Sequence, residues 1–265
     1  MNVSPVRHSI LSFFNKKRFK FKPEYRNKLE AITDIFKKDE FCNLEPVKKL
    51  LSIYDETFQR YTKIQDTNPK KHPFIVFEGL DATGKTTISR NIAQLHNAKL
   101  LRTPPASTST LRAYFDNDPL RIPFYSYGNY IAELEVMEAL REGPVVLDRY
   151  WHSTAVFWLS QSVADGSSTE LPPKSDKVYT WPSDLLKPDM VIVLTTTEAN
   201  RRKRIARRKV ITDQEALLKS SVDFRKNIIK AYENMSDPKV EFVDSNDSIA
   251  ATVELVNDRI KPLFS

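Results

Sequence analysis

The sequence predicts an α/β fold in which a five-stranded parallel sheet carries helices on both faces. From residue 73 onward, short apolar runs alternate with longer segments of helical periodicity, which is the pattern of a parallel sheet covered by helices. A glycine-containing turn stands directly between the first apolar run and the first helical segment. We expect the strands at residues 74–78, 99–102, 145–148, 190–194 and 240–243.

The first strand leads into a glycine-rich loop. Residues 79–86 read Gly-Leu-Asp-Ala-Thr-Gly-Lys-Thr, a complete G-x-x-x-x-G-K-[ST] pattern. In such a loop the backbone amides and the N-terminus of the following helix surround a phosphate group. Lys85 adds a positive charge for the β- and γ-phosphates, and the Thr86 hydroxyl is a ligand for Mg²⁺. The motif predicts a P-loop NTPase, the alternative being a structural turn between a strand and a helix.

The third strand ends in Asp148-Arg149-Tyr150. In an open parallel sheet ligands gather at the carboxyl ends of the strands, so this motif is expected beside the phosphate-binding loop. Asp148 can then hold Mg²⁺ directly or through water, and Arg149 can bind a phosphate with two hydrogen bonds. His152 follows, and we expect it to pack or to form hydrogen bonds instead of transferring a proton.

The third motif is basic. Residues 201–209 contain seven Lys and Arg side chains, and Arg201, Arg204 and Arg208 share one helical face. Such crowding of like charge is unfavourable unless water or an anion compensates it. Two interpretations remain open: a solvated helix face, or a mobile lid that brings arginines onto a transferring phosphoryl group.

A long helix is expected at residues 123–141, with an apolar stripe that belongs mostly to the core. Tyr127 and Asn129 lie near its start, where they could face a nucleotide base. Residues 164–182 are rich in Ser, Gly and Pro and predict a surface loop.

Charge and cysteine content limit the function classes. Residues 1–72 hold 16 Lys and Arg against 9 Asp and Glu, whereas residues 73–265 hold 25 of each. The neutral larger part therefore gives no support for a nucleic-acid-binding role. No stretch approaches the roughly 20 apolar residues of a membrane span. Cys42 is the single cysteine and leaves no partner for an internal disulfide, so a reducing compartment fits.

The chain is expected to divide into three parts. Residues 1–23 carry six basic and no acidic side chains, which suits either a mitochondrial presequence or a disordered basic tail. Residues 24–72 predict a helical appendage, and residues 73–265 form the catalytic domain.

Two helices are expected in the appendage. The shorter spans about residues 26–36, and Asn43 is the expected N-cap of the longer one. The turn-rich residues 66–73 lead from there to the catalytic domain. One face of the longer helix collects Val47, Leu50, Leu51, Tyr54, Phe58 and Tyr61.

These motifs, in this order, make the chain resemble the thymidylate kinase family over about residues 73–263. Longer strings are similar to the mitochondrial-type UMP-CMP kinases within that family. They are Pro-Pro at residues 104–105, Phe-Tyr-Ser-Tyr-Gly-Asn-Tyr-Ile at 124–131, Asp-Arg-Tyr-Trp-His-Ser-Thr-Ala at 148–155 and Trp-Pro-Ser-Asp-Leu-Leu-Lys-Pro-Asp at 181–189. The resemblance implies an enzyme that phosphorylates CMP, UMP, dCMP and dUMP, with ATP and Mg²⁺ as the donor.

The resemblance also assigns residues to the two nucleotides. It implies that Asp81 holds the sugar hydroxyl of the acceptor and that Arg149, with Arg112, holds the acceptor phosphate. Asn129 is expected in the same acceptor site, and Asp148 joins Thr86 at the metal. The residues implied to bind ATP are Gly79, Leu80, Asp81, Ala82, Thr83, Gly84, Lys85, Thr86 and Thr87.

The source of the catalytic cation is a second implication. Thymidylate kinases that carry an arginine within the phosphate-binding loop use it in catalysis, but that position is Ala82 here. The lid must then supply the cation, through Arg204 and Arg208, with Arg201 behind them. Together with Lys85 and Arg149, the first two complete the expected catalytic set.

Alternatives remain within and outside this interpretation. Residues 156–158 are Val-Phe-Trp, where many bacterial thymidylate kinases have an Ala-Tyr-Gln segment that reads thymine. A thymidylate kinase, or a broader mono- and diphosphate kinase, is the rival enzyme. A nucleotide-gated protein that binds nucleic acid or a membrane surface is the rival from another class. We expect small pyrimidine nucleotides and no nucleic acid as partners, with room for a homodimer, in the mitochondrial matrix or alternatively the cytoplasm.

Overall fold

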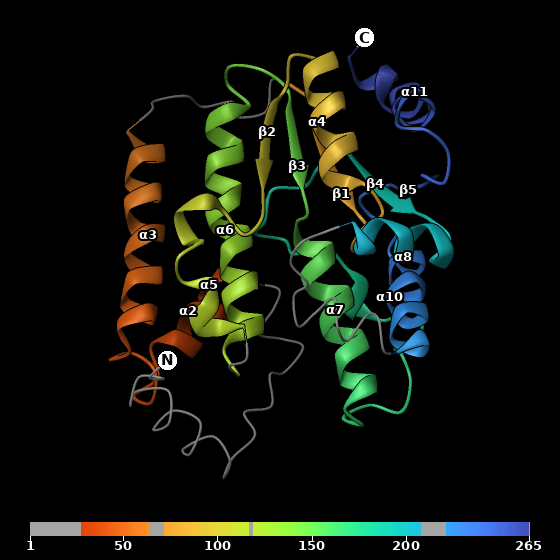
Figure 1. Cartoon of the computed structure of the whole chain (residues 1–265). Coiled ribbons are helices and arrows are strands. Elements are labelled where there is room, and N and C mark those ends of the chain that lie inside the picture. The colour runs from red at the N-terminus through yellow and green to blue at the C-terminus, as the bar shows by residue number, and fades with distance from the viewer. Residues whose placement is uncertain (1–27, 64–71, 117–118, 208–220, 265) are drawn as a thin grey trace.

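The protein has the expected parallel sheet with helices on both faces (Figure 1). The computed structural model describes residues 28–63, 72–116, 119–207 and 221–264. The five strands have the order β2-β3-β1-β4-β5, and all neighbours pair in parallel. The prediction of the fold class is confirmed, and each strand lies within one residue of its expected bounds. The strands are β1 (Phe74–Glu78), β2 (Lys99–Arg102), β3 (Val145–Asp148), β4 (Met190–Thr195) and β5 (Val240–Asp244).

Helices surround this sheet. No helix in the described ranges has the length and apolar character needed to cross a bilayer. The helices are α2 (Leu29–Phe36), α3 (Glu45–Thr62), α4 (Lys85–Leu95), α5 (Arg112–Phe115), α6 (Arg121–Ala139), α7 (Trp151–Ala164), α8 (Glu198–Ala206), α10 (Val222–Asn234) and α11 (Ile249–Ile260), with 3₁₀ turns at η2 (Ala106–Thr108), η3 (Lys177–Tyr179) and η4 (Lys261–Phe264).

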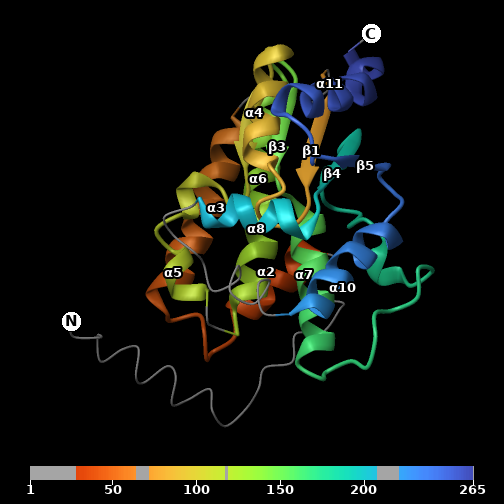
Figure 2. The same cartoon turned by 45° about the vertical axis from the view of Figure 1, so that its right-hand side comes forward.

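Both faces of the sheet are buried because successive side chains of a strand point to opposite sides. In β1, Phe74 and Val76 belong to the larger core, which they share with α6, α7 and α10. Ile75 and Phe77 belong to a second core on the other face, where α4 and α11 pack. Figures 1 and 2 show α4 and α11 side by side on that face.

The described part of the appendage, α2 and α3, packs on α6 and shares the larger core (Figure 1). Tyr127 lies in this contact, because its ring centroid is 5.5 Å from that of Phe36 and 5.2 Å from that of Tyr54. The expectation that Tyr127 faces a base is therefore wrong. The periodicity of α6 could not show this, since its side chains are buried around most of its circumference.

Two details of α3 also differ from expectation. Asn43 does not cap the helix, because the N-cap is Leu44 and no side chain bonds to the first turn. The buried face is rotated toward Ile53 and Thr57, so Phe58 lies at its edge and is 44% exposed. Residues 1–23 and most of the linker expected at 66–73 lie outside the described residues.

Candidate active site

The phosphate-binding loop begins at the carboxyl end of β1 and ends where α4 begins. Gly79 has a φ of +127°, and a Cβ built there would lie 2.3 Å from the carbonyl oxygen of Leu194 on β4. Gly84 is the N-cap of α4 with a φ of +101°. Both positions favour glycine because of their positive φ, and at Gly79 the close Leu194 carbonyl oxygen also excludes a side chain. The resulting loop leaves the first amides of α4 facing a potential anion.

Lys85 is buried beneath this loop. Its Nζ donates hydrogen bonds to the carbonyl oxygens of Gly79, at 3.0 Å, and Leu80, at 2.7 Å. Burial, followed by the nearby Arg149 charge, lowers the pKa of Lys85 to about 8. The side chain is therefore still mostly protonated at neutral pH, and an entering phosphate can replace the two carbonyl oxygens as its acceptor.

Thr86 and Asp148 meet beside the loop. The Thr86 Oγ1 donates to Asp148 Oδ2 at 2.7 Å, which joins the start of α4 to the end of β3. A hydroxyl and a carboxylate at this spacing fit Mg²⁺, which takes one or two protein oxygens and completes its shell with phosphate and water.

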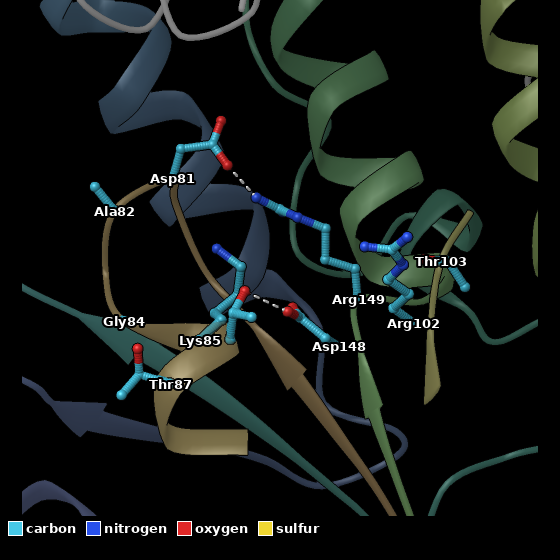
Figure 3. Close-up of a pocket in the computed structure, with 10 residues that line it drawn as sticks. Asp81, Ala82, Gly84, Lys85, Thr87, Arg102, Thr103, Asp148 and Arg149 are labelled. Atoms are coloured by element: carbon cyan, nitrogen blue, oxygen red, sulfur yellow. Dashed lines mark hydrogen bonds and ion pairs between the residues drawn. The ribbon is translucent and has the colours of Figure 1, made fainter. Parts of the chain in front are cut away.

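Arg149 follows Asp148 in a left-handed conformation, with a φ of +70°. Its guanidinium forms an ion pair with Asp81 (Figure 3). It also donates to Ser153 Oγ at 2.9 Å and to the carbonyl oxygen of Gly79 at 3.3 Å. Burial opposes the charge of Arg149, but Asp81 and other neighbours outweigh it and raise its pKa. The residue is thus a permanent cation held at the loop.

Glu78 anchors this turn from the end of β1. One carboxylate oxygen accepts from the amides of Tyr150, at 2.8 Å, and Ser153, at 3.1 Å. The other accepts from the hydroxyls of Ser153 and Tyr232, the latter at 2.9 Å. Burial raises the pKa of Glu78, and the Arg149 charge partly offsets this. Glu78 was not predicted as a site residue, although a carboxylate at the end of an otherwise apolar strand was a usable signal.

Two cavities flank the loop and share Ala82, Gly84 and Thr87. The phosphate cavity, on the β2–β3 side, has a volume of about 200 Å³ (Figure 3). The lid cavity, on the β5 side, measures about 420 Å³. The phosphate cavity is lined by Asp81, Ala82, Gly84, Lys85, Thr86, Thr87, Arg102, Thr103, Asp148 and Arg149. The lid cavity is lined by Ala82, Thr83, Gly84, Thr87, Ile88, Arg204, Arg207, Ser245, Asp247, Ser248, Ile249 and Thr252.

The basic motif forms much of α8, which lies across the carboxyl end of β1 in Figure 2. Arg204 Nη1 donates to the carbonyl oxygen of Thr83 at 3.0 Å and to Ser245 Oγ at 3.2 Å. Arg201 is buried instead, and its Nε donates to Glu198 at 2.7 Å. Hydrogen bonding from Arg201 is the main reason that the pKa of Glu198 is lowered to about 2. Arg208 lies outside the described residues.

The sequence profile of thymidylate kinase matches residues 77–256, more than half of the chain. The chain belongs to the thymidylate kinase family. Membership indicates a nucleoside monophosphate kinase, an activity for which a phosphate-binding loop between two cavities is suited.

Relatives of this thymidylate kinase family member include human "UMP-CMP kinase 2, mitochondrial", which is 38% identical over 198 residues. That match covers 74% of this chain but 44% of the human protein, so the chain spans less than half of that relative. A "Probable thymidylate kinase" of Methanococcus maripaludis strain C7 is 28% identical over 204 residues, covering 71% of this chain and 92% of that protein.

Solved structures support the fold of the family. Thymidylate kinase from Candida albicans has a TM-score of 0.54 at 18% identity, covering 72% of this chain and 92% of that one. Deoxyadenosine kinase from M. mycoides with bound dATP has a TM-score of 0.52 at 18% identity, covering 71% and 98%. At this identity the likeness concerns the fold alone.

Two residues predicted for the acceptor site are not among the residues that line the cavities. Arg112 on α5 pairs with Asp116 at 3.5 Å and is not among the cavity linings. Asn129 is buried and donates to Thr154 Oγ1 at 3.2 Å. Their roles stay predictions. Arg102 lines the phosphate cavity and was missed, although a polar residue at the end of a strand next to β3 was a signal.

His152 has a packing environment, as expected. Its ring centroid lies 5.4 Å from that of Trp151 and 5.3 Å from that of Trp181. Neither ring nitrogen has a hydrogen-bond partner within the described ranges, and burial lowers the pKa of His152 to about 3. A neutral, enclosed imidazole of this kind is poorly suited to proton transfer at neutral pH.

Proposed function

We propose that this chain transfers the γ-phosphoryl group of ATP to pyrimidine nucleoside monophosphates, namely CMP, UMP, dCMP and dUMP. The observation that carries the proposal is the pair of cavities that share the phosphate-binding loop from opposite sides. A kinase of this class needs room for two nucleotides whose phosphates meet at one loop. The identity with human UMP-CMP kinase 2 supports the choice of pyrimidine acceptors.

The donor ATP would extend from the lid cavity, which holds its base, to the phosphate-binding loop, which holds its phosphates. Ile88 and Ile249 give the lid cavity apolar side chains for a base, and Asp247 adds a polar group to its lining. The phosphates then lie against the first amides of α4 and Lys85. Mg²⁺ held by Thr86 and Asp148 would neutralise part of the phosphate charge.

The acceptor fits the phosphate cavity. The acceptor phosphate would replace Asp81 as the ion-pair partner of Arg149. Arg149 would then align an oxygen of the acceptor phosphate for in-line attack on the γ-phosphoryl group of the donor. Asp81 then becomes available for the acceptor sugar hydroxyl. A strong general base is not needed, because a monophosphate is already anionic at neutral pH.

The lid supplies the remaining cation in this proposal. Ala82 adds no charge to the loop, whereas Arg204 reaches the loop carbonyl oxygens from α8. We assign Arg204 the role of stabilising the charge of the transferring phosphoryl group, together with Arg208. Arg112 on α5 remains the proposed second arginine for a closed acceptor site, and Asn129 remains a proposed acceptor-site residue.

The test is a panel of monophosphates in a coupled assay of ADP release. We expect turnover with CMP, UMP and their deoxy forms to exceed turnover with dTMP. The Val-Phe-Trp segment at residues 156–158 motivates this order. A clear preference for dTMP would favour a thymidylate kinase, as the name of the Methanococcus maripaludis relative suggests. Salt-dependent polyanion binding without turnover would instead favour the binding-protein alternative.

We also propose a mitochondrial location. Residues 1–23 carry six basic and no acidic side chains, and the human relative is named as mitochondrial. Fusion of these residues to a soluble reporter tests the proposal, and we expect the reporter to enter mitochondria. A diffuse cytosolic signal would reject it and favour the cytoplasm.

A further inference from the structure

We propose that Arg102 is a second cationic residue for the acceptor phosphate, acting beside Arg149. This inference deepens the proposed function and rests on it. Arg102 is the last residue of β2 and lies next to Asp148 in the parallel register with β3. Its side chain lines the phosphate cavity together with Arg149 and Lys85 (Figure 3).

The three cations of this cavity differ in their present contacts. Lys85 donates to two loop carbonyl oxygens, and Arg149 is paired with Asp81. The side chain of Arg102 makes no hydrogen bond or ion pair within the residues that the structure describes, and the residue is exposed. The cavity also holds the carboxylates of Asp81 and Asp148, and a phosphate entering it would give the Arg102 guanidinium a charged hydrogen-bond acceptor. Arg102 is thus the cation of this cavity that is ready to bind one.

The backbone that carries Arg102 is fixed in position. The pairing of β2 with β3 holds the residue on one side, and the amide of Thr103 donates to the carbonyl oxygen of Asp148 at 3.1 Å. The two arginines therefore extend from adjacent strand ends whose spacing is set by the sheet. A site on rigid elements places its charges more reproducibly than one on a loop.

The strand order decides which phosphate Arg102 meets. The lid cavity lies toward β5, the phosphate-binding loop follows β1 in the middle, and Arg102 lies at the end of β2 on the far side. A donor whose base occupies the lid cavity runs across the loop toward Arg149. The anion next to the last phosphate of the donor is the acceptor phosphate. The guanidinium groups of Arg102 and Arg149, at the ends of neighbouring strands, can then both donate hydrogen bonds to it.

The experiment compares Arg102→Ala and Arg102→Lys with Lys99→Ala. Lys99 is an exposed cation at the opposite end of the same strand, so its variant controls for the loss of one charge from β2. Steady-state kinetics with CMP would give KM for each nucleotide and kcat, and calorimetry would give CMP affinity without ATP. We expect Arg102→Ala to raise the KM and Kd for CMP about 10- to 100-fold, the usual value of a charge-assisted hydrogen bond. The KM for ATP should stay within about twofold, and Arg102→Lys should recover part of the loss.

Four outcomes would overturn the inference. Unchanged CMP binding in Arg102→Ala, with normal wild-type turnover, would reject Arg102 while leaving the kinase proposal intact. A rise in the KM for ATP alone, or an equal loss of CMP binding in Lys99→Ala, would assign the effect to the donor or to general charge. Wild-type protein that neither binds nor phosphorylates any monophosphate would reject the proposed function, and Arg102 with it.

Discussion

Replacing Glu78 by Gln tests whether this buried carboxylate positions Arg149. The change keeps the shape of the side chain and removes its charge. One oxygen accepts from two amides at the start of α7, and the other accepts from the hydroxyls of Ser153 and Tyr232. Ser153 Oγ in turn accepts from Arg149 at 2.9 Å. Glu78 is therefore connected to the catalytic guanidinium through one intervening hydroxyl.

The expected loss follows from these contacts. If the amide oxygen of the introduced glutamine keeps the α7 amides, its NH₂ group faces the two hydroxyls, which must rotate to accept. All four bonds then lose a charged acceptor, a loss of about 1 kcal/mol each. Relief from burying a charge offsets part of this, so we expect destabilisation of about 1–2 kcal/mol. A displacement of Arg149 by roughly 1 Å would lower kcat/KM about 100-fold.

Coupled ADP release with CMP and urea unfolding measure the two effects separately. Tyr232→Phe is the comparison variant, because it removes one hydroxyl donor to Glu78 from α10 and leaves the two amide bonds of Glu78 to Tyr150 and Ser153 in place. It also removes the longer contacts of the Tyr232 hydroxyl with the Gly79 amide, at 3.4 Å, and with Ser153 Oγ, at 3.5 Å. We expect its kcat/KM to stay within about tenfold of the parent. If Glu78→Gln keeps kcat/KM within about threefold, Glu78 contributes to stability alone and the positioning argument is wrong.

Three further predictions concern the loop, the lid and a buried acid. Lys85→Ala should lower turnover by about 10³-fold or more in the coupled assay, and near-normal turnover of a folded variant would reject the donor site. Arg204→Ala should lower kcat by about 10³-fold, far more than it raises the KM for the acceptor. Arg202→Ala is the control, because it removes a 65% exposed side chain and should leave kcat largely unchanged. Equal losses of kcat in the two variants would mean that the wrong helical face was chosen. Burial raises the pKa of Glu133 from 4.5 to about 7, so the native state binds the proton more tightly than the unfolded state does. The protein is therefore most stable below pH 4.5 with respect to this group, and its free energy of unfolding falls as the pH rises to about 7. Glu133→Gln should remove up to about 3 kcal/mol of this pH dependence in urea unfolding between pH 4.5 and 8, and an unchanged slope would contradict the assignment.

The sequence predicted the strands and the loop well because their signals are local. An apolar run bounded by turns marks each strand, and the complete loop pattern leaves little choice of conformation. The contacts of Arg149 were different, because Asp81 and Ser153 come from separate elements and only the fold brings them together. Periodicity also grouped Arg201 with Arg204, whereas Glu198, one turn earlier, neutralises Arg201. That i,i+3 spacing was visible in the sequence.

The cations at the loop share an arrangement that bears on how two nucleotides bind. Lys85 and Arg204 donate hydrogen bonds to loop carbonyl oxygens, and Arg149 forms an ion pair with Asp81. Each is therefore compensated before any phosphate arrives, which limits the repulsion between them. In the proposed mechanism the acceptor phosphate displaces Asp81 from Arg149, and the released carboxylate can then accept from the sugar hydroxyl. The displacement of Asp81 thus provides both a guanidinium for the acceptor phosphate and a carboxylate for the acceptor sugar. The exposed Arg102 lies in the same cavity, where it can attract the phosphate that displaces Asp81.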